Sequence, residues 1–322
     1  MGRNFKRIFF ATDVHGSEIC FRKFIGAADF YKADTLILGG DITGKLIVPI
    51  VERKDGRYTS KYLGQDWELK SQGELADFEQ KIKITGFYPY RTNQSEMDEL
   101  NADRSNVDQL FLRLMIETLK SWVVLAEKTL ENKGVQCYIT GGNDDPFEIS
   151  QAIPNSGTVQ NPEDRVVHLD EIHEMISLGY SNPTPWKLPR DVPEETLAQK
   201  IEEMTSRVQN MANCVFNLHV PPKDSNLDQC PLLDSSVDPP KTVMKSGQPV
   251  MYGAGSQAVT DAIKRYQPLL GLHGHIHESK ASEKIGRTVC LNPGSEYSEG
   301  ILRGVLVNYD QKKILSHQFT SG

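Results

Sequence analysis

The chain has 322 residues, 38% of them hydrophobic, and a formal net charge of −7. This length allows one large domain or two ordinary ones with a substantial core. The acidic balance and the lack of a Lys/Arg block disfavour nucleic acid as a partner, and no apolar stretch approaches the ~20 residues that span a membrane. Five scattered cysteines without a Cys-x-x-Cys pair disfavour a disulfide framework or a zinc knuckle, and favour a cytoplasmic protein.

The first part of the chain predicts a strand, a helix and a second strand. A strand is expected over about 6–12, a helix begins near Ser17, and Leu36-Ile37-Leu38 forms the next strand. This order implies a parallel pair with a right-handed crossover. The next expected strand, 135–140, follows only after about ninety residues, which is far longer than an ordinary connection. An insertion is therefore expected between the second and third strands.

The insertion is expected over residues 45–134. Runs at 46–51 and 58–63 around Asp55-Gly56 predict a β-hairpin, and two helices are expected at 73–83 and 95–132. We interpret this segment as a cap beside the functional site, within a single domain of residues 1–322. Further along, helices are expected at 194–211 and 255–266, a long loop at 221–253, and strands at 288–291, 304–309 and 314–319.

Short apolar runs in this chain end on side chains of the types that bind metals. In an open α/β sheet, residues that follow the carboxyl ends of the strands converge in one crevice. The convergence of imidazole, carboxylate and amide groups indicates metal ions. The residues are Asp13 and His15, Asp41, Asn143, His219, and the pair His275 and His277.

The stretch Gly39-Gly40-Asp41-Ile42-Thr43-Gly44-Lys45 offers a different interpretation, because it matches most of a nucleotide-binding phosphate loop. The next residue is Leu46, where that motif needs Ser or Thr for magnesium, and the following run is typical of a strand where the motif needs a helix. We therefore set this interpretation aside.

The metal-binding residue types resemble the motifs of the calcineurin-like metallophosphoesterases. The match consists of Asp13-Val14-His15-Gly16, Gly40-Asp41, Gly142-Asn143, His219 and Gly274-His275-Ile276-His277, in the order of that family. It covers most of the chain outside the insertion and the 221–253 loop. The resemblance implies an α/β fold with the layered αββα architecture of that family.

The resemblance also implies a ligand set for two divalent cations. Asp13, His15 and His277 would bind one ion, Asn143, His219 and His275 the other, and Asp41 would bridge them. The mixed donors suit Mn, Fe, Zn or Ni, and manganese is the ion we expect to support an assay. Asn143 and His219 would also act in catalysis, in which a metal-bound hydroxide attacks phosphorus.

The sequence departs from the family at Asp144, where the family usually carries a histidine that assists the leaving group. Asp144 could donate a proton in its place, although nearby cations would lower its pKa. Its carboxylate would repel dianionic monoesters more than monoanionic diesters, which favours diesters. His168 and His173 could replace the histidine, but for both, as for His273, we predict packing, surface or supporting roles.

We predict a dimetal-dependent phosphodiesterase that acts on a small-molecule diester, with a nucleotide as one candidate. Lys45, Trp186 and Arg190 are the expected substrate contacts. A phosphomonoesterase or protein phosphatase is the alternative enzyme, and a metal-binding scaffold that binds a protein partner is the non-enzyme alternative. The sequence leaves open whether the chain forms a homo-oligomer.

Overall fold

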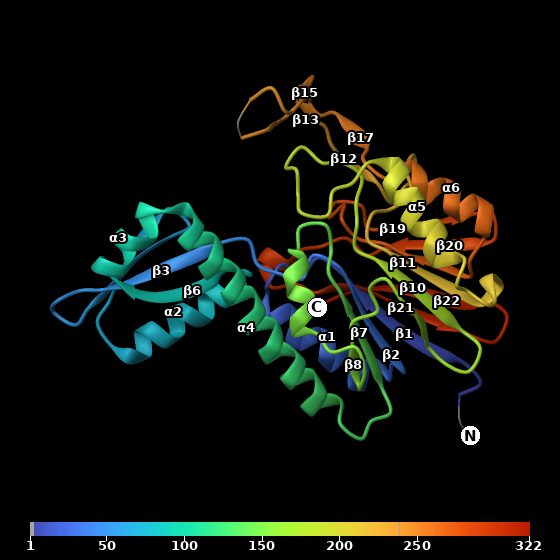
Figure 1. Ribbon diagram of the computed structural model, residues 1–322, viewed down its shortest axis with the longest axis horizontal. Coiled ribbons are helices and arrows are strands. Elements are labelled where there is room, and N and C mark those ends of the chain that lie inside the picture. Colours follow the sequence, from blue (N-terminus) through green and yellow to red (C-terminus); the bar gives the residue numbers. More distant parts are fainter. Residues whose placement is uncertain (1–2, 238) are drawn as a thin grey trace.

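Two six-stranded sheets form the centre of the molecule in the computed structural model, which describes residues 3–237 and 239–322 (Figure 1). The first sheet has the order β22 (Ile314–Ser321), β21 (Arg303–Tyr309), β1 (Lys6–Ala11), β2 (Thr35–Gly39), β7 (Gln136–Thr140) and β8 (Val159–Gln160). The second has the order β19 (Ala281–Ile285), β20 (Thr288–Asn292), β18 (Leu270–Leu272), β11 (Cys214–Leu218), β10 (Glu174–Leu178) and β9 (Val166–His168).

The continuous apolar runs of the central strands follow from burial on both faces. In β1, Ile8 and Phe10 face the second sheet and pack in one cluster with Val215 of β11. Phe9, between them, belongs to the cluster on the opposite face. Side chains alternate between faces along a strand, so an all-apolar strand needs a partner layer on each side. The two sheets therefore pack face to face.

Helices cover the outer face of each sheet and complete the four-layered αββα architecture that the sequence predicted. Helices α1 (Glu18–Tyr31) and α4 (Arg104–Leu130) pack on the first sheet, where the rings of Phe21 and Trp122 stack with centroids 4.2 Å apart. Helices α5 (Glu194–Thr205) and α6 (Gln257–Tyr266) pack on the second sheet around Phe216.

The expected boundaries of two segments are wrong. Helix α5 ends at Thr205, and Met211, which the sequence analysis placed at the end of this helix, begins a separate 3-10 turn, η2 (Met211–Asn213). The long loop expected over 221–253 contains short antiparallel pairs. These are β12 (Gln229–Pro231) with β17 (Met251–Gly253), β13 (Leu233–Asp234) with β14 (Lys241–Thr242), and β15 (Met244–Lys245) with β16 (Gln248–Pro249). The other 3-10 turns are η1 (Phe147–Ala152) and η3 (Tyr297–Glu299).

The insertion of residues 45–134 contains more structure than a hairpin and two helices. Its sheet has the order β5 (Gln65–Leu69), β4 (Tyr58–Tyr62), β3 (Ile47–Glu52) and β6 (Tyr88–Asn93), and helix α2 (Gln72–Ile84) packs on it. The expected helix 95–132 is broken into α3 (Gln94–Ala102) and α4. Asp103 causes the break: its backbone is extended, and its carboxylate caps α4 by accepting from the N–H of Ser105.

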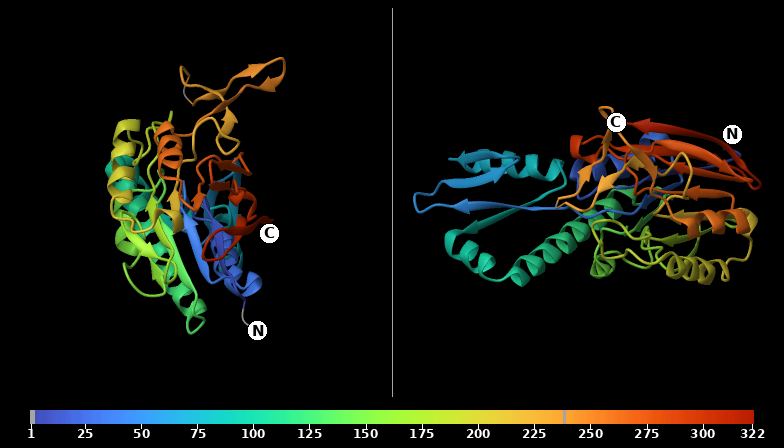
Figure 2. Two further views of the ribbon diagram at one scale, coloured as in Figure 1. Left: turned by 90° about the vertical axis from the view of Figure 1, so that its right-hand side faces the viewer. Right: turned by 90° about the horizontal axis from the view of Figure 1, so that it is seen from above.

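The insertion extends from one end of the layered body, and α4 runs from it back along the first sheet (Figure 2). Its root is packed tightly against two loops of the body. The side chain of Ser17 donates to the carbonyl of Ile84, and Tyr88 Oη accepts from the N–H of Gly44 at 2.8 Å. A Cβ on Gly86 would lie 2.0 Å from the carbonyl oxygen of His15, so only glycine fits there.

No helix within residues 3–237 and 239–322 combines the length and hydropathy that a membrane crossing needs. The five cysteines are free thiols, which agrees with the expected lack of a disulfide framework.

The contact at Gly86 can be tested against a glycine that shares its backbone conformation. Gly86 has φ +83° and Gly56 has φ +80°, but no atom lies within 4 Å of a Cβ built at Gly56. We expect Gly56→Ala to lower the free energy of unfolding by about 1–2 kcal/mol through strain alone, and Gly86→Ala to lower it by at least ~1 kcal/mol more. Urea denaturation measures both values. Equal losses of unfolding free energy in the two variants would show that the contact between Gly86 and His15 relaxes to accept a side chain.

Candidate metal centre

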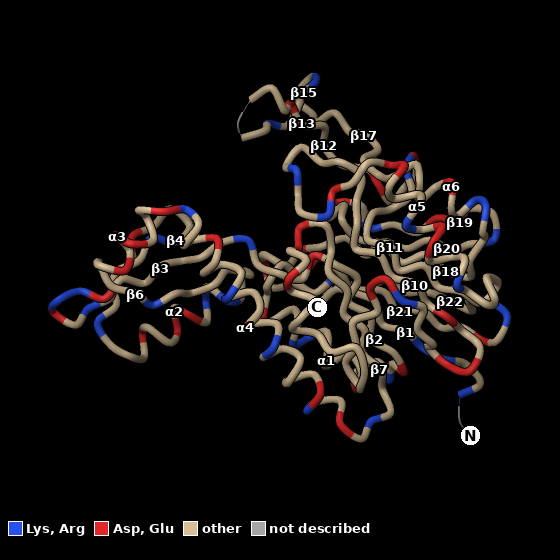
Figure 3. Tube along the Cα trace, viewed as in Figure 1, with Lys and Arg blue, Asp and Glu red and all other residues tan. Residues whose placement is uncertain are grey.

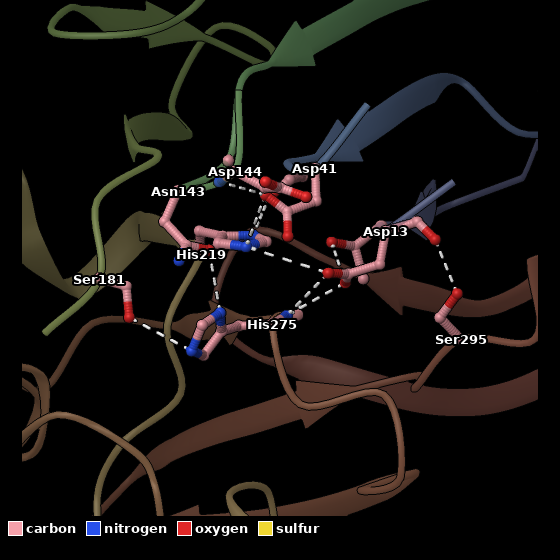
Figure 4. Close-up of polar contacts among 12 residues, drawn as sticks. Asp13, Asp41, Asn143, Asp144, Ser181, His219, His275 and Ser295 are labelled. Atoms are coloured by element: carbon pink, nitrogen blue, oxygen red, sulfur yellow. Dashed lines mark hydrogen bonds and ion pairs between the residues drawn. The ribbon is translucent and has the colours of Figure 1, made fainter. Parts of the chain in front are cut away.

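The residues at the C-terminal ends of strands from both sheets lie close together (Figure 4). Strands β1, β2 and β7 run parallel in the first sheet, and β10, β11, β18 and β20 run parallel in the second. The residues that follow these strands therefore meet, as expected for an open sheet. All seven predicted ligands are brought together there: Asp13, His15, Asp41, Asn143, His219, His275 and His277.

Four of these residues form a first cluster, in which one possible ligand atom of each lies within 4.8 Å of the others: Asp13, His15, Asp41 and His277. The Nε2 atoms of His15 and His277 are 3.2 Å apart. Oδ1 of Asp13 lies 3.3 Å from His277 Nε2, and Oδ2 of Asp41 lies 3.8 Å from His15 Nε2. The side chains thus converge on one point.

Asp41 also belongs to a second cluster, with His219 and His275. Its Oδ1 lies 3.4 Å from His219 Nε2, so its two carboxylate oxygens face different clusters. Asn143 joins this cluster, because its Oδ1 lies 2.9 Å from His275 Nδ1. The position of Asp41 matches the bridging role that the family resemblance implies.

Four of the seven side chains stand on left-handed backbone. The φ angles are 53° at Asp13, 40° at His15, 48° at Asp41 and 67° at His275. Such conformations cost on the order of 1–3 kcal/mol each in non-glycine residues and concentrate at functional sites. Hydrogen bonds between the loops hold them: the N–H of Asp13 donates to Gly40 O, and that of His15 donates to Asp41 O.

Neighbouring groups orient the ligand atoms toward the clusters. Nδ1 of His219 bonds the carbonyl of Gly39 at 3.1 Å, which leaves Nε2 facing the carboxylates. Nε2 of His275 lies 3.3 Å from Ser181 Oγ, which leaves Nδ1 facing Asn143. Hydrogen bonds of this kind fix the tautomer and the ring orientation of metal-binding histidines.

The donor set fits divalent transition metals. Asp13 and Asp41 are 1% and 4% exposed, and two carboxylates buried so close together need cations to balance them. His219 Nε2 is buried and has no hydrogen-bond partner among the described residues. Burial lowers the pKa of His275 to about 4, so its imidazole is neutral and able to bind a metal at neutral pH.

Asp144, the departure from the family pattern, lies beside the first cluster. Its Oδ2 is 3.2 Å from Lys45 Nζ and 3.7 Å from His15 Nδ1, and its N–H donates to Asp41 Oδ1. Burial and the nearby charge of Asp41 raise the pKa of Asp144 to about 6. Lys45, one of the predicted substrate contacts, is thus at the site and paired with Asp144.

Arg190 does not fit its predicted role as a substrate contact. Its side chain is buried, donates to the carbonyl of Asp145 and lies 3.6 Å from Glu163. It therefore supports the loop behind Asn143. Trp186 differs, since its side chain is 58% exposed and lines the cavity at the site.

Sequence reasoning missed residues that hold the loops together. Asp145 is buried and accepts from the N–H groups of Ile42, Thr43 and Gly142, so it ties the Asp41 loop to the Asn143 loop. In the sequence, only its position next to Asn143-Asp144 indicated that Asp145 lies at the site.

Asp191 was missed as well. One of its oxygens accepts from Asn143 Nδ2 at 2.9 Å, and the other accepts from the N–H groups of Thr184 and Leu188. No motif in the sequence marks this residue.

The remaining histidines lie where the sequence analysis placed them. His273 is buried with Nδ1 at 2.8 Å from the carbonyl of Leu218, and His173 pairs with Asp170 in the core. His168 lies exposed on β9. The phosphate-loop interpretation fails in the structure too, because the residues after Lys45 enter strand β3 and no helix begins there.

No family model matches the chain. A curated relative, the uncharacterized protein MJ1162 of Methanocaldococcus jannaschii, is 29% identical over 132 residues, 40% of this chain. The chain matches about half the length of that relative, 52%.

Among solved structures, one crystal structure superposes with a TM-score of 0.59 at 17% identity over 98% of both chains, which shows the fold. The structure of an archaeal phosphodiesterase gives a TM-score of 0.33 at 11% identity and covers 98% of this chain and 99% of that one. The residues that resemble the motifs of the calcineurin-like metallophosphoesterases thus converge at one edge of two packed sheets.

Proposed function

We propose that the chain is a metal-dependent phosphodiesterase that hydrolyses a small or nucleotide-type diester. The observation that carries the proposal is the pair of ligand clusters that share Asp41. Two bound cations would supply Lewis-acid charge to the phosphoryl oxygens and activate water for the attack on phosphorus. Asp13, His15 and His277 would hold one ion, and Asn143, His219 and His275 the other.

The side chains at the mouth of the site support a diester over a monoester. Asp144 places a carboxylate where the family usually has a histidine, and Lys45 pairs with it. The cavity that contains the clusters is lined by two lysines, Lys45 and Lys223, against five acidic residues. A dianionic monoester would meet more repulsion there than a monoanionic diester.

The alternatives find less support. A phosphomonoesterase or protein phosphatase binds a dianionic phosphate, and further cationic side chains near Asp144 would strengthen that binding. A nuclease would need a basic track for the nucleic-acid backbone, whereas Lys and Arg are interspersed with Asp and Glu along the trace (Figure 3). A scaffold without activity would have no need for seven converging ligand groups, four of them on strained backbone.

Loss of the bridging carboxylate tests the enzyme proposal. With manganese, Asp41→Asn should lower kcat/KM for an aryl phosphodiester at least ~100-fold, because both ions lose a charged ligand. Asp98→Asn on the exposed face of α3 is the matched control and should leave the rate unchanged. Metal analysis by mass spectrometry should show bound manganese reduced only in the Asp41 variant. Wild-type protein inactive on diesters and monoesters alike would favour the scaffold.

The charges at Asp144 and Lys45 should set the choice between diester and monoester. Asp144→Asn removes a negative charge near the phosphate and should raise the monoester-to-diester ratio of kcat/KM about tenfold, whereas Lys45→Met should lower it by a similar factor. The assay compares 4-nitrophenyl phosphate with its methyl diester at constant ionic strength. A ratio that stays the same in both variants contradicts an electrostatic basis for diester selection.

A further inference from the structure

The cavity at the metal centre is larger than a phosphate group needs. It has a volume of about 1080 Å³ and reaches from Asp41, His275 and His277 to helix α4, to the loop of residues 182–189 and to the β12–β17 hairpins. Cavities of this size accommodate a whole drug-sized ligand. The side chains beyond the metal residues must therefore contact a further part of the substrate.

One wall of this cavity is the apolar face of α4. Phe111, Leu112 and Met115 line it, and Met115 is buried. Phe111 packs edge-to-face on Tyr88, with ring centroids 5.8 Å apart. Because Tyr88 Oη accepts from the N–H of Gly44, the residue before Lys45, this wall is fixed relative to the site.

The second wall is the loop of residues 182–189, where Trp186 and Leu188 line the cavity. Three prolines, Pro183, Pro185 and Pro189, restrict its backbone. Asp191 pins the loop, as one of its oxygens accepts from the N–H groups of Thr184 and Leu188 at 3.0 Å. The loop is thus held by Asp191 and its prolines, while Trp186, which is 58% exposed, lines the cavity.

An exposed indole on a preorganised loop is a binding element, because little conformational entropy is lost when a ligand packs on it. The other oxygen of Asp191 accepts from Asn143 Nδ2. The same carboxylate therefore fixes the distance between the apolar wall and the metal centre. From the third side, Leu233 and Tyr252 of the hairpins line the cavity.

The charges in the cavity limit what can bind. Of its two lysines, Lys45 pairs with Asp144 beside the first cluster, and Lys223 is exposed near the start of α6. Asp108, Glu194 and Glu278 lie among the remaining lining residues. A polyphosphate or a polynucleotide would bring negative charge into this region, where these three acidic residues outnumber Lys223. A monoanion with an uncharged apolar substituent suits the cavity, because its phosphate can lie at the metal residues and its apolar group between the apolar walls.

We propose that the substrate is a phosphodiester with one large apolar or aromatic ester group, which binds between Phe111 on α4 and Trp186 on the loop. The inference rests on the proposed phosphodiesterase function and names the chemistry of its substrate. Two sources share this chemistry, an aliphatic chain and a planar ring such as a nucleobase, and the substrates below distinguish them.

A series of diesters with one leaving group tests the subsite. Each substrate carries 4-nitrophenol as the leaving group, and the second ester group is methyl, phenyl, octyl or thymidine 5′-yl. With manganese, kcat/KM should be at least tenfold higher for one of the three large groups than for methyl. An octyl preference identifies a chain, and a phenyl or thymidine preference identifies a ring. Equal values across the series would overturn the inference and leave the phosphodiesterase proposal intact.

Substitutions at Trp186 and Phe111 test whether these two side chains form the proposed subsite. Trp186→Ala and Phe111→Ala should each lower the ratio of kcat/KM between the preferred diester and the methyl diester about five- to tenfold. Val124→Ala, a change at a 65% exposed position on the same helix, should leave this ratio as in the wild type. A ratio that persists in both subsite variants would overturn the inference.

Binding to metal-free protein separates the subsite from catalysis. In EDTA, calorimetric titration with the monomethyl esters of octylphosphonate and phenylphosphonate should show at least one binding more tightly than the monomethyl ester of methylphosphonate, and Trp186→Ala should weaken that binding at least fivefold. If this result holds while every diester resists hydrolysis in manganese, the proposed activity fails and the subsite stands. If all three phosphonates bind alike, the subsite fails.

Discussion

Two buried carboxylates set the main constraint on this fold. Asp13 and Asp41 lie among four imidazoles at the edge where both sheets end, and neither is open to solvent. Such charges stay buried only when cations and fixed donors balance them. Hydrogen bonding to His277 and the charge of His219 outweigh the opposing effect of burial and lower the pKa of Asp13 to about 2. The loop geometry, the left-handed backbone and the supporting bonds of Asp145 and Asp191 all serve this arrangement.

The insertion and the 182–189 loop are coupled to this centre by specific contacts. Gly86 packs against the carbonyl of His15, and Tyr88 bonds the loop that carries Lys45. On the other side, Asp191 links Asn143 to the loop that carries Trp186. The proposed substrate contacts are thereby held at fixed positions relative to the candidate metal ligands. This is how variable connections can set specificity on a common sheet framework.

The central layers and the ligand set were predictable because they depend on local sequence. Apolar runs such as Ile8–Ala11 predict strands buried on both faces, and the polar residues after them must meet at one edge. The break at Asp103 was missed because the helical pattern of apolar residues continues across it, and Asp103 acts through a cap. Strand β5 carries mostly polar residues, and the roles of Arg190 and Asp191 depend on tertiary contacts, which periodicity cannot reveal.

We propose that Asp41 joins two cations in one site. Electron paramagnetic resonance of the protein titrated with Mn²⁺ measures this most directly, because two manganese ions that share a bridging carboxylate are magnetically coupled. We expect two equivalents to bind per chain with the multiline spectrum of a coupled pair. A single equivalent with the six-line spectrum of an isolated ion would contradict the account.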